Sequence, residues 1–246
     1  MKSIIVTGGA AGIGAAICAR FAAGGFRVGV LDMSREGAEK TAALLPGAMA
    51  LQADVTDRAS VEAAFAAFGD TPDVLINNAG IATFGPLLDQ EPAAFARVTQ
   101  VNLIGTYTCA WIAAKGMVAR GSGIIINMTS INAVTPGPGS GAYPATKAGV
   151  GKLTEQMAIE WGEHGLRVNC IAPGFIDGGM SAPFYADAKV RALRGGAVPT
   201  GRLGTVEDIA EAAWFLASDN ASYISGHQLV VDGAVCHSLL RALPRE

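Results

Sequence analysis

The sequence predicts one α/β domain built on a doubly wound parallel sheet of about seven strands, with helices on both faces. Short apolar runs rich in Val and Ile recur along the 246 residues, and Ala-rich segments long enough for helices separate them. The runs are apolar throughout instead of alternating with polar residues, which is typical of parallel strands covered on both sides. A chain that is 50% hydrophobic and 16% charged can bury one large core, so we expect a single domain over 1–246.

The elements of this domain follow in order along the chain. The expected strands are 3–9, 27–32, 48–55, 73–80, 123–130, 167–174 and 227–234. The expected helices are 98–120, 142–165 and 205–219. Thr205 with Asp208 three residues later is a capping-box pattern and predicts the start of the last helix. The segment 174–203 is rich in Gly and Pro and has no clear period, so we expect a substrate lid with a short helix near 186–194.

Composition excludes several classes of function. A net charge of −3 with scattered basic residues indicates no nucleic-acid partner. No run approaches the ~18–20 apolar residues of a membrane span, and the first apolar run is far shorter than a secretion signal, so we expect a cytoplasmic protein. The cysteines lie far apart without metal-ligand spacing, which predicts buried thiols and no metal site. They are Cys18, Cys109, Cys170 and Cys236.

A nucleotide site is predicted at the end of the first strand. Gly8, Gly12 and Gly14 form a turn between a strand and a helix, where backbone N–H groups and the helix N-terminus can hold a pyrophosphate. Asp32 ends the second strand, where a carboxylate binds the adenosine ribose diol and repels a 2′-phosphate. An isolated acid would more often cap a turn, and Arg35 weakens the preference. Together the turn and the acid predict a Rossmann-type site for NAD.

A reacting pair is predicted on the helix over 142–165. Tyr143 and Lys147 are four residues apart, so they share one helix face with Cβ atoms about 6 Å apart. The ammonium favours the phenolate, so we expect the pKa of Tyr143 to fall from its reference of about 10. Such a phenol is suited to general acid/base chemistry. Ser130, at the carboxyl end of a strand, can donate a hydrogen bond to a substrate oxygen.

The order and spacing of six motifs resemble those of the short-chain dehydrogenase/reductase family. The resemblance covers nearly the whole chain and includes the thirteen-residue step from Ser130 to Tyr143. The motifs are TGGAAGIG at 7–14, NNAG at 77–80, VN ending at Asn102, Ser130, YPATK at 143–147 and PG at 173–174. Each motif is weak alone, but the set is specific, and it implies an NAD-dependent enzyme acting on secondary alcohols or ketones.

The resemblance also implies roles for individual residues. Tyr143 would be the acid/base, Ser130 would orient the substrate oxygen, and Lys147 would hold the nicotinamide ribose and tune Tyr143. Asn102 would hold a water that links the lysine to solvent, although it could also simply cap a helix. The implied cofactor contacts are Gly8, Gly12, Ile13, Gly14, Asp32, Asp54, Val55, Asn78, Ala79, Gly80, Tyr143, Lys147, Pro173, Gly174 and Ile176.

The substrate pocket is expected between the segment 130–143 and the lid. The residues expected to line it are Ser130, Asn132, Tyr143, Phe175 and Tyr185. Their mixture of polar and apolar groups fits a small secondary alcohol such as a sugar, polyol or hydroxy acid, and equally an alicyclic or aryl alcohol. Arg191, Arg194 and Arg202 would provide an anion site when the lid closes. The role of Asp177, next to the expected nicotinamide contact, stays open.

Two other functions compete with an NAD-dependent alcohol dehydrogenase. A 3-oxoacyl-thioester reductase using NADPH would share the motifs, but Asp32 argues against it. A nucleotide-sensing protein would keep the fold without the chemistry, but such proteins lose Tyr or Lys of the pair, and Tyr143 and Lys147 are both present. Relatives in the family are usually tetramers, so we expect a homotetramer that uses the apolar faces around Trp111 and 152–161.

Overall fold

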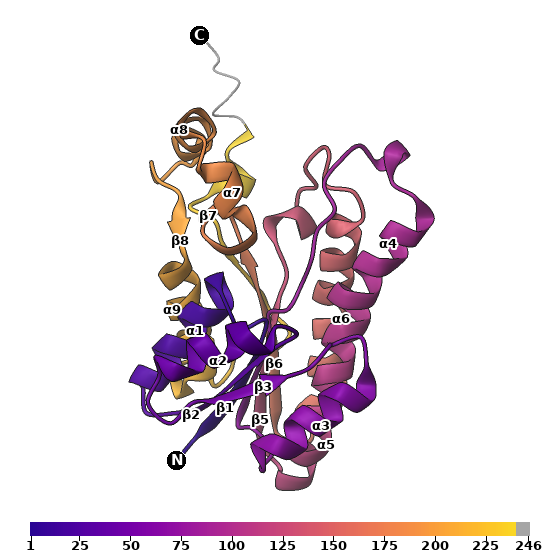
Figure 1. Ribbon diagram of the computed structural model, residues 1–246, viewed down its shortest axis with the longest axis vertical. Helices are drawn as coiled ribbons and strands as arrows, with labels where there is room; N and C mark the ends of the chain where they lie inside the picture. Colours follow the sequence, from indigo (N-terminus) through magenta and orange to yellow (C-terminus); the bar gives the residue numbers. More distant parts are fainter. Residues whose placement is uncertain (240–246) are drawn as a thin grey trace.

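The computed structural model describes residues 1–239, so the end of the predicted domain, 240–246, lies outside the described residues. Seven strands form one sheet in the order β3-β2-β1-β4-β5-β6-β9 (Figure 1). All neighbouring strands in it are parallel, which confirms the predicted fold class. The strands are β1 Ser3–Thr7, β2 Arg27–Asp32, β3 Met49–Gln52, β4 Val74–Asn77, β5 Gly123–Met128, β6 Leu166–Pro173 and β9 Gln228–Val231.

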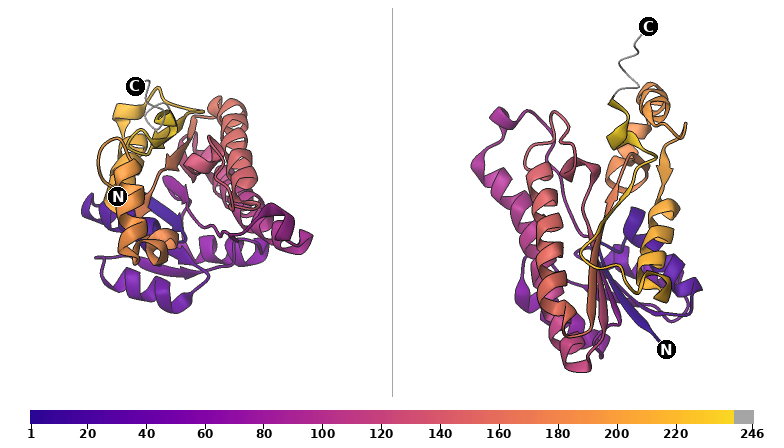
Figure 2. Two further views of the ribbon diagram at one scale, coloured as in Figure 1. Left: turned by 90° about the horizontal axis from the view of Figure 1, so that it is seen from above. Right: turned by 180° about the vertical axis from the view of Figure 1, so that it is seen from behind.

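Helices cover both faces of this sheet. The helices are α1 Gly12–Ala23, α2 Arg35–Ala43, α3 Arg58–Phe68, α4 Pro92–Thr99, α5 Thr106–Arg120, α6 Tyr143–Gly162, α7 Ala182–Tyr185, α8 Ala188–Ala197 and α9 Val206–Ala217. Helices α1, α2 and α9 pack on one face, and α3, α5 and α6 pack on the other (Figures 1 and 2). Single 3-10 turns lie at Leu87–Asp89, Ile131–Ala133, Gly179–Ser181, Asp219–Ala221 and Val235–His237. Among residues 1–239, no helix is long and apolar enough to cross a membrane.

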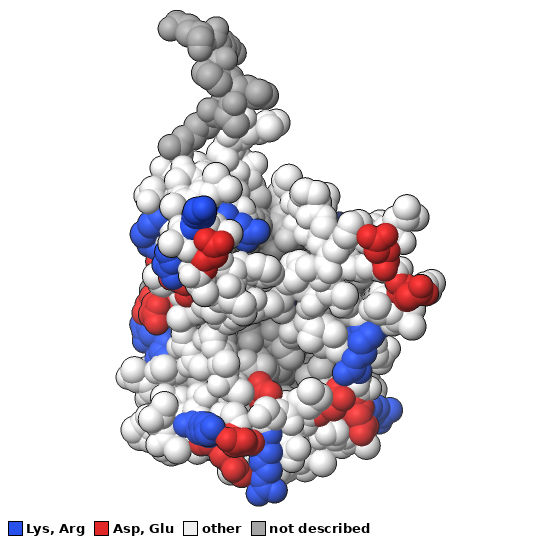
Figure 3. Space-filling view, turned by 45° about the horizontal axis from the view of Figure 1, so that its top comes forward, with Lys and Arg blue, Asp and Glu red and all other residues white. Residues whose placement is uncertain are grey.

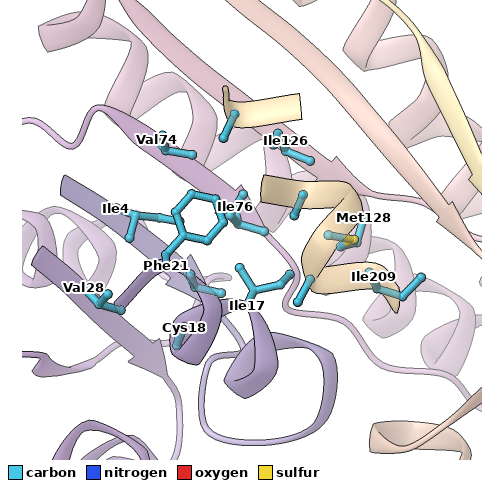
Figure 4. Packing of buried hydrophobic residues seen from close by; sticks show 14 of the residues in the cluster. Ile4, Ile17, Cys18, Phe21, Val28, Val74, Ile76, Ile126, Met128 and Ile209 are labelled. Atoms are coloured by element: carbon cyan, nitrogen blue, oxygen red, sulfur yellow. The ribbon is translucent and has the colours of Figure 1, made fainter. Parts of the chain in front are cut away.

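The uninterrupted apolar strands are explained by two cores, one on each face of the sheet. Ile4 and Val6 of β1 pack in one core with Phe21 of α1 (Figure 4). Ile5, between them, points to the opposite face and packs in the second core with Phe68 of α3. Successive side chains of a strand point to opposite faces, so a strand covered on both sides needs an apolar residue at every position.

The helix predicted over 98–120 is not one regular helix. The structure starts it earlier, with α4, and inserts a π-helical segment, Gln100–Gly105, before α5. The wider turn lies where the Asn102 side chain bonds the backbone of Ile81 and the Asn102 carbonyl accepts from the Thr106 hydroxyl at 2.8 Å. A π-turn inside a helix often marks a functional position, and no periodicity of apolar residues reveals it.

The other two predicted helices are confirmed. The segment 142–165 forms α6, and 205–219 contains α9. The capping box at the start of α9 is complete, since the Thr205 hydroxyl accepts from the Asp208 N–H at 3.3 Å and the Asp208 carboxylate accepts from the Thr205 N–H at 2.7 Å.

The predicted lid is largely ordered into short elements. Its strand β7, Ile176–Asp177, pairs with β8, Gly204–Thr205, and helices α7 and α8 lie between them in sequence. The expected short helix near 186–194 is α8. Figures 1 and 2 show the lid above the carboxyl ends of the sheet strands, which places it over the predicted site.

Candidate active site

The predicted site residues converge at the carboxyl edge of the sheet. Figure 3 shows a hollow there, between the lid on one side and the region of α4 on the other, with mostly uncharged residues on its walls. Ligands of open α/β sheets bind at this edge because loops from several parallel strands meet there.

The glycine turn after β1 is built for close backbone approach. Gly8 and Gly12 have φ angles of +64° and +55°, in the left-handed region that favours glycine. A Cβ on Gly14 would lie 2.1 Å from the Gly8 carbonyl oxygen, and one on Gly12 would lie 2.5 Å from the Cα of Gly179 in the lid. No side chain caps the start of α1, so its N–H groups can bind an anion. The turn therefore fits the pyrophosphate of a dinucleotide.

Asp32 lies beside this turn, at the end of β2. Its carboxylate accepts hydrogen bonds from the N–H groups of Ala10, at 3.2 Å, and Ser34, at 2.9 Å. Arg35, which weakened the prediction of NAD, pairs with Glu39 on the same helix at 2.8 Å. A carboxylate with free lone pairs thus stands next to the glycine turn, an arrangement that fits the recognition of a ribose.

Residues expected near the adenosine half line the next two strand ends. Asp54 accepts from the N–H and hydroxyl of Thr56, at 2.9 and 2.7 Å, and these bonds lower its pKa. Val55 is buried against Gly105. The Asn78 amide donates to the carbonyls of Thr7 and Gly8, both at 3.1 Å, and so ties the end of β4 to the glycine turn.

Lys147 is buried in the first turns of α6. Its side-chain nitrogen donates to the Met128 carbonyl at 2.8 Å, and burial lowers its pKa to about 8. A Cβ on Gly80 would lie 3.4 Å from the Lys147 nitrogen and 3.2 Å from the Asn102 side-chain oxygen. A side chain at position 80 would therefore crowd both the lysine and the asparagine.

The fully buried Asn102 side chain joins α4–α5 to the loop after β4. It accepts from the Ile81 N–H at 2.8 Å and donates to the Ile81 carbonyl at 2.9 Å and to the Thr146 hydroxyl at 3.2 Å. Since it lies within a continuous helical run, Asn102 does not cap a helix, which corrects that alternative. These contacts hold the loop after β4 beside α6, the helix that carries Lys147.

Tyr143 differs from expectation in its pKa. Burial raises this pKa, because a phenolate loses its hydration there, and the nearby Ser130 hydroxyl offsets the rise only in part. The Lys147 nitrogen lies 5.6 Å from the centre of the Tyr143 ring and points to the Met128 carbonyl. The predicted lowering of the Tyr143 pKa by Lys147 is therefore wrong for the polypeptide by itself, and Ser130 is the side chain that acts on the phenol.

The remaining cofactor residues lie where β6 runs into the lid and where α1 begins. Pro173 ends β6, and a Cβ on Gly174 would lie 2.6 Å from the Cα of Asp232. Ile176 is buried in β7, while Ile13 is partly exposed in the first turn of α1. None of these four residues shows a polar contact with the described residues that identifies a cofactor.

The expected substrate residues are brought together only in part. The Ser130 hydroxyl accepts from the Asn132 N–H at 3.1 Å, and the Asn132 side chain holds the Gly137 N–H at 2.8 Å, so Asn132 shapes its own loop. Phe175 is half-buried at the base of the lid. Tyr185 is buried inside the lid, with 2% of its surface exposed. Asp177, whose role the sequence left open, turns to Arg191 at 2.7 Å.

Comparisons with known proteins agree with this geometry. A family model described as enoyl-(acyl carrier protein) reductase matches residues 8–235. Cis-4-hydroxycyclohexanecarboxylate dehydrogenase of Sinomonas cyclohexanicum is 42% identical, over 93% of this chain and 94% of that protein. 3beta-Hydroxysteroid dehydrogenase 1 of Eggerthella lenta is 39% identical, over 95% of this chain and 93% of that protein. A solved short chain dehydrogenase/reductase family protein superposes with a TM-score of 0.87 at 39% identity, covering 94% of this chain and 96% of that one.

The chain belongs to the short-chain dehydrogenase/reductase family. As a member, it is an oxidoreductase of alcohols and ketones that works with a nicotinamide dinucleotide. Its described residues, 1–239, include no cluster of three His, Cys, Asp or Glu side chains that could hold a metal ion.

Sequence reasoning missed two contacts of this short-chain dehydrogenase/reductase. Gly179 packs against Gly12, so the lid touches the glycine turn directly. Phe84, in the loop after β4, meets Phe184 of α7 edge to face, with ring centres 5.2 Å apart. The pair of glycines at 178–179 was a visible signal for the first contact. Nothing in the local sequence around Phe84 pointed to the second.

Proposed function

We propose that this protein is an NAD(H)-dependent dehydrogenase of secondary alcohols, which also reduces the corresponding ketones. The observation that carries the proposal is the placing of three groups at one edge of the sheet: Ser130 follows β5, Tyr143 opens α6, and the buried Lys147 ammonium donates to the Met128 carbonyl at 2.8 Å. The hydroxyls of Ser130 and Tyr143 and the ammonium of Lys147 can together give a proton to a substrate oxygen or take one from it.

The residues have distinct parts in this chemistry. The Ser130 oxygen accepts from the Asn132 N–H, and its own proton, which faces the Tyr143 phenol, would turn to the substrate oxygen when substrate binds. Tyr143, whose pKa burial raises, is a neutral phenol at physiological pH and donates its proton to the oxygen of a ketone. In the oxidative direction the same group takes the alcohol proton. A bound nicotinamide supplies the hydride acceptor or donor, and the glycine turn, Asp32 and Lys147 would hold it.

The preference for NAD over NADP is proposed from Asp32. Its negative charge lies beside the glycine turn, bonded to the Ala10 N–H, where a ribose 2′-phosphate would be repelled. The nearby guanidinium of Arg35 is engaged by Glu39, so it offers less charge to a 2′-phosphate. Both contacts support NAD.

Replacement of the phenol tests the proposed chemistry. Tyr143→Phe should lower kcat for a secondary alcohol by about 100-fold or more, since it removes the acid/base and keeps the ring. The dissociation constant for NADH, from fluorescence titration, should stay unchanged. Tyr223→Phe is the matched control, because Tyr223 is fully exposed and should leave kcat unchanged. Undiminished activity of Tyr143→Phe would favour a nucleotide-sensing protein instead.

A second candidate is a 3-oxoacyl-thioester reductase using NADPH. The family model's description, which names a reductase of acyl carrier protein substrates, is the observation that favours it. Asp32 opposes it, for the reason given above. Two kcat/KM values separate the candidates: one for a 3-oxoacyl thioester with NADPH, and one for a simple secondary ketone with NADH. A first value well above the second would support the thioester reductase.

We further propose a homotetramer that is held in part by the outer faces of α5 and α6. Tyr107 and Ile159 on these helices are 45% and 74% exposed, which is costly for large apolar groups in water. Trp111, expected in the same interface, is covered by the side chains of Arg58 and Lys115. Light scattering at micromolar concentration should report four chains. Ile159→Glu should reduce that number, and a monomeric parent protein would contradict the proposal.

A further inference from the structure

Three arginines in or beside the lid were expected to offer an anion site, and the structure separates them. Arg191 pairs with Asp177 at 2.7 Å. Arg202 holds both oxygens of Asp208, at 2.6 and 2.9 Å, and thereby lowers the pKa of that carboxyl to about 2. No carboxylate of residues 1–239 pairs with Arg194. Arg194 is therefore the member of this set whose charge is not neutralised by the described part of the chain.

Arg194 is held in place by aromatic rings instead of by an acid. Its guanidinium carbon lies 5.1 Å from the ring centre of Phe175 and 5.8 Å from those of Phe184 and Tyr185. The side chain is partly buried among them. Stacking uses the faces of a guanidinium and leaves its N–H groups, which lie in the plane, free to donate. A positioned fork of donors suits a carboxylate, which it can bind through two parallel hydrogen bonds.

Tyr185 adds a second unused donor to the same cluster. Its hydroxyl is buried and has no hydrogen-bond partner among the described residues. A buried polar atom without a partner is costly, and such atoms in folded proteins commonly belong to a binding site. Because the Tyr185 ring contacts Arg194, one anionic group near the pair could accept from both side chains.

The cluster adjoins the reacting groups. Strands β5 and β6 are hydrogen-bonded neighbours, with Ser130 just beyond the end of one and Phe175 just beyond the end of the other. Phe184 extends the cluster across to Phe84 in the loop after β4. A substrate whose oxygen lies at Ser130 would therefore have apolar walls around its carbon frame and Arg194 beyond them.

The charged side chains around the hollow bear on where an anionic group could bind. Figure 3 shows most of the Lys and Arg of the upper part over the lid, with some acidic residues among them, and acidic residues with a basic one on the opposite side of the hollow. A pocket lined by Phe175 and Ile176 also contains Arg202, Asp208 and Asp232. Two carboxylates outnumber the one arginine there, so that pocket is unfavourable for an anion. Arg194 is therefore the better place for an anion to bind.

We propose that Arg194 and the Tyr185 hydroxyl bind a carboxylate carried by the secondary alcohol or ketone substrate. The substrate class is then a hydroxy acid with an apolar frame between the reacting carbon and the carboxylate. This inference rests on the proposed dehydrogenase function and adds the specificity-determining residues to it.

The experiment compares a hydroxycycloalkane carboxylic acid with its methyl ester, which has nearly the same frame but no charge. The parent enzyme with NAD should favour the acid by about tenfold or more in kcat/KM. Arg194→Met should lower kcat/KM for the acid by about 10- to 100-fold, as expected for a lost charge-assisted hydrogen bond, and change the value for the ester by less than about twofold. Tyr185→Phe should lower the acid value by about three- to tenfold.

Two further variants keep the test decisive. Lys189→Met removes one positive charge from the same helix, at an exposed position, and should leave both substrates unaffected. Arg194→Lys keeps the charge without the fork and should fall between the parent and Arg194→Met. It also replaces Arg194→Met if that variant fails to fold, as judged by circular dichroism and the NADH dissociation constant.

The possible failures are distinguishable. Equal kcat/KM of the parent for acid and ester, or equal losses for both in Arg194→Met, would overturn the carboxylate site and leave the dehydrogenase function intact. If the parent enzyme with NAD oxidised none of the secondary alcohols tested, the ester included, the proposed function itself would be overturned. A sulfonate analogue that replaces the acid without loss would support recognition of charge at Arg194.

Discussion

The carboxylate of Asp32 accepts a hydrogen bond from the backbone N–H of Ala10, at 3.2 Å. This contact joins the end of β2 to the glycine turn after β1, two segments that meet because their strands are neighbours. The second oxygen of Asp32 accepts from the Ser34 N–H and so also orders the start of α2. One side chain thus supports the glycine turn and presents negative charge beside it.

Asp32→Ser should shift the cofactor preference toward NADP. We expect kcat/KM with NAD to fall by about tenfold or more, because a hydrogen bond to a charged acceptor is lost, and kcat/KM with NADP to rise. The melting temperature should fall slightly as Ala10 loses its partner. Asp70→Ser removes an exposed carboxylate that pairs with Arg27 and should leave the cofactor ratio unchanged. A parent enzyme that already prefers NADPH would contradict the assignment.

The buried ammonium of Lys147 should make stability depend on pH. Burial lowers its pKa from 10.5 to about 8. Below pH 8 the folded and unfolded states both carry the proton, and the folded state bears the full cost of burying the charge. Between pH 8 and 10.5 the folded state loses the proton first, so the contribution to stability rises with pH, by up to ~3 kcal/mol.

Urea unfolding of the parent and of Lys147→Met from pH 7 to pH 10.5 measures this contribution. The difference in unfolding free energy should move in favour of the parent as pH rises. Other titrating groups, such as Cys18 and Cys109, are common to both proteins and cancel in the difference. A difference that does not vary with pH would show that the ammonium is not desolvated as the structure indicates.

Ala234→Gly should stabilise the protein. Ala234 is the single non-glycine residue with positive φ among residues 1–239, at φ 73° and ψ 20°. An L-residue in this region costs about 1–2 kcal/mol of stability, and glycine removes that cost. Because unfolded glycine has more conformational freedom to lose, we expect a net rise of only ~0.5–1 kcal/mol in the free energy of unfolding. Ala66→Gly, at an exposed position inside α3, should instead destabilise by ~1 kcal/mol. Thermal unfolding distinguishes the two signs.

Gly12→Ala should impair cofactor binding more than backbone strain alone would. Its Cβ would lie 2.5 Å from the Cα of Gly179, so either the lid or the turn must move. Gly25→Ala is the matched control, because Gly25 also has positive φ, at +81°, but an added Cβ meets nothing within 4 Å. Both variants should lose about 1–2 kcal/mol of stability to backbone strain, and Gly12→Ala should lose more because of the close contact with Gly179. Gly12→Ala alone should raise the NADH dissociation constant, by about tenfold or more, and equal constants in the two variants would contradict the lid contact.

Much of the site could be predicted because its motifs are local. A glycine turn after a strand, an acid at the end of the next strand and a Tyr and Lys four residues apart are each readable within a few residues. The π-turn at Asn102 could not be read in this way. It depends on the backbone of Ile81, twenty-one residues away, which satisfies the Asn102 side chain. The pKa of Tyr143 was likewise mispredicted, since spacing on a helix says nothing of burial.

The sequence by itself determined the parallel sheet, the glycine turn after β1 and the placing of Tyr143 and Lys147 on one helix, because strand periodicity and short motifs act over neighbouring residues. Tertiary structure alone decided which lid arginine has no paired carboxylate among the described residues. Arg191 and Arg202 are neutralised by Asp177 and Asp208, and Arg194 is stacked on aromatic rings. The physical reason is that charge and solvation at one atom depend on every group packed around it, and those groups come from segments that only folding brings together.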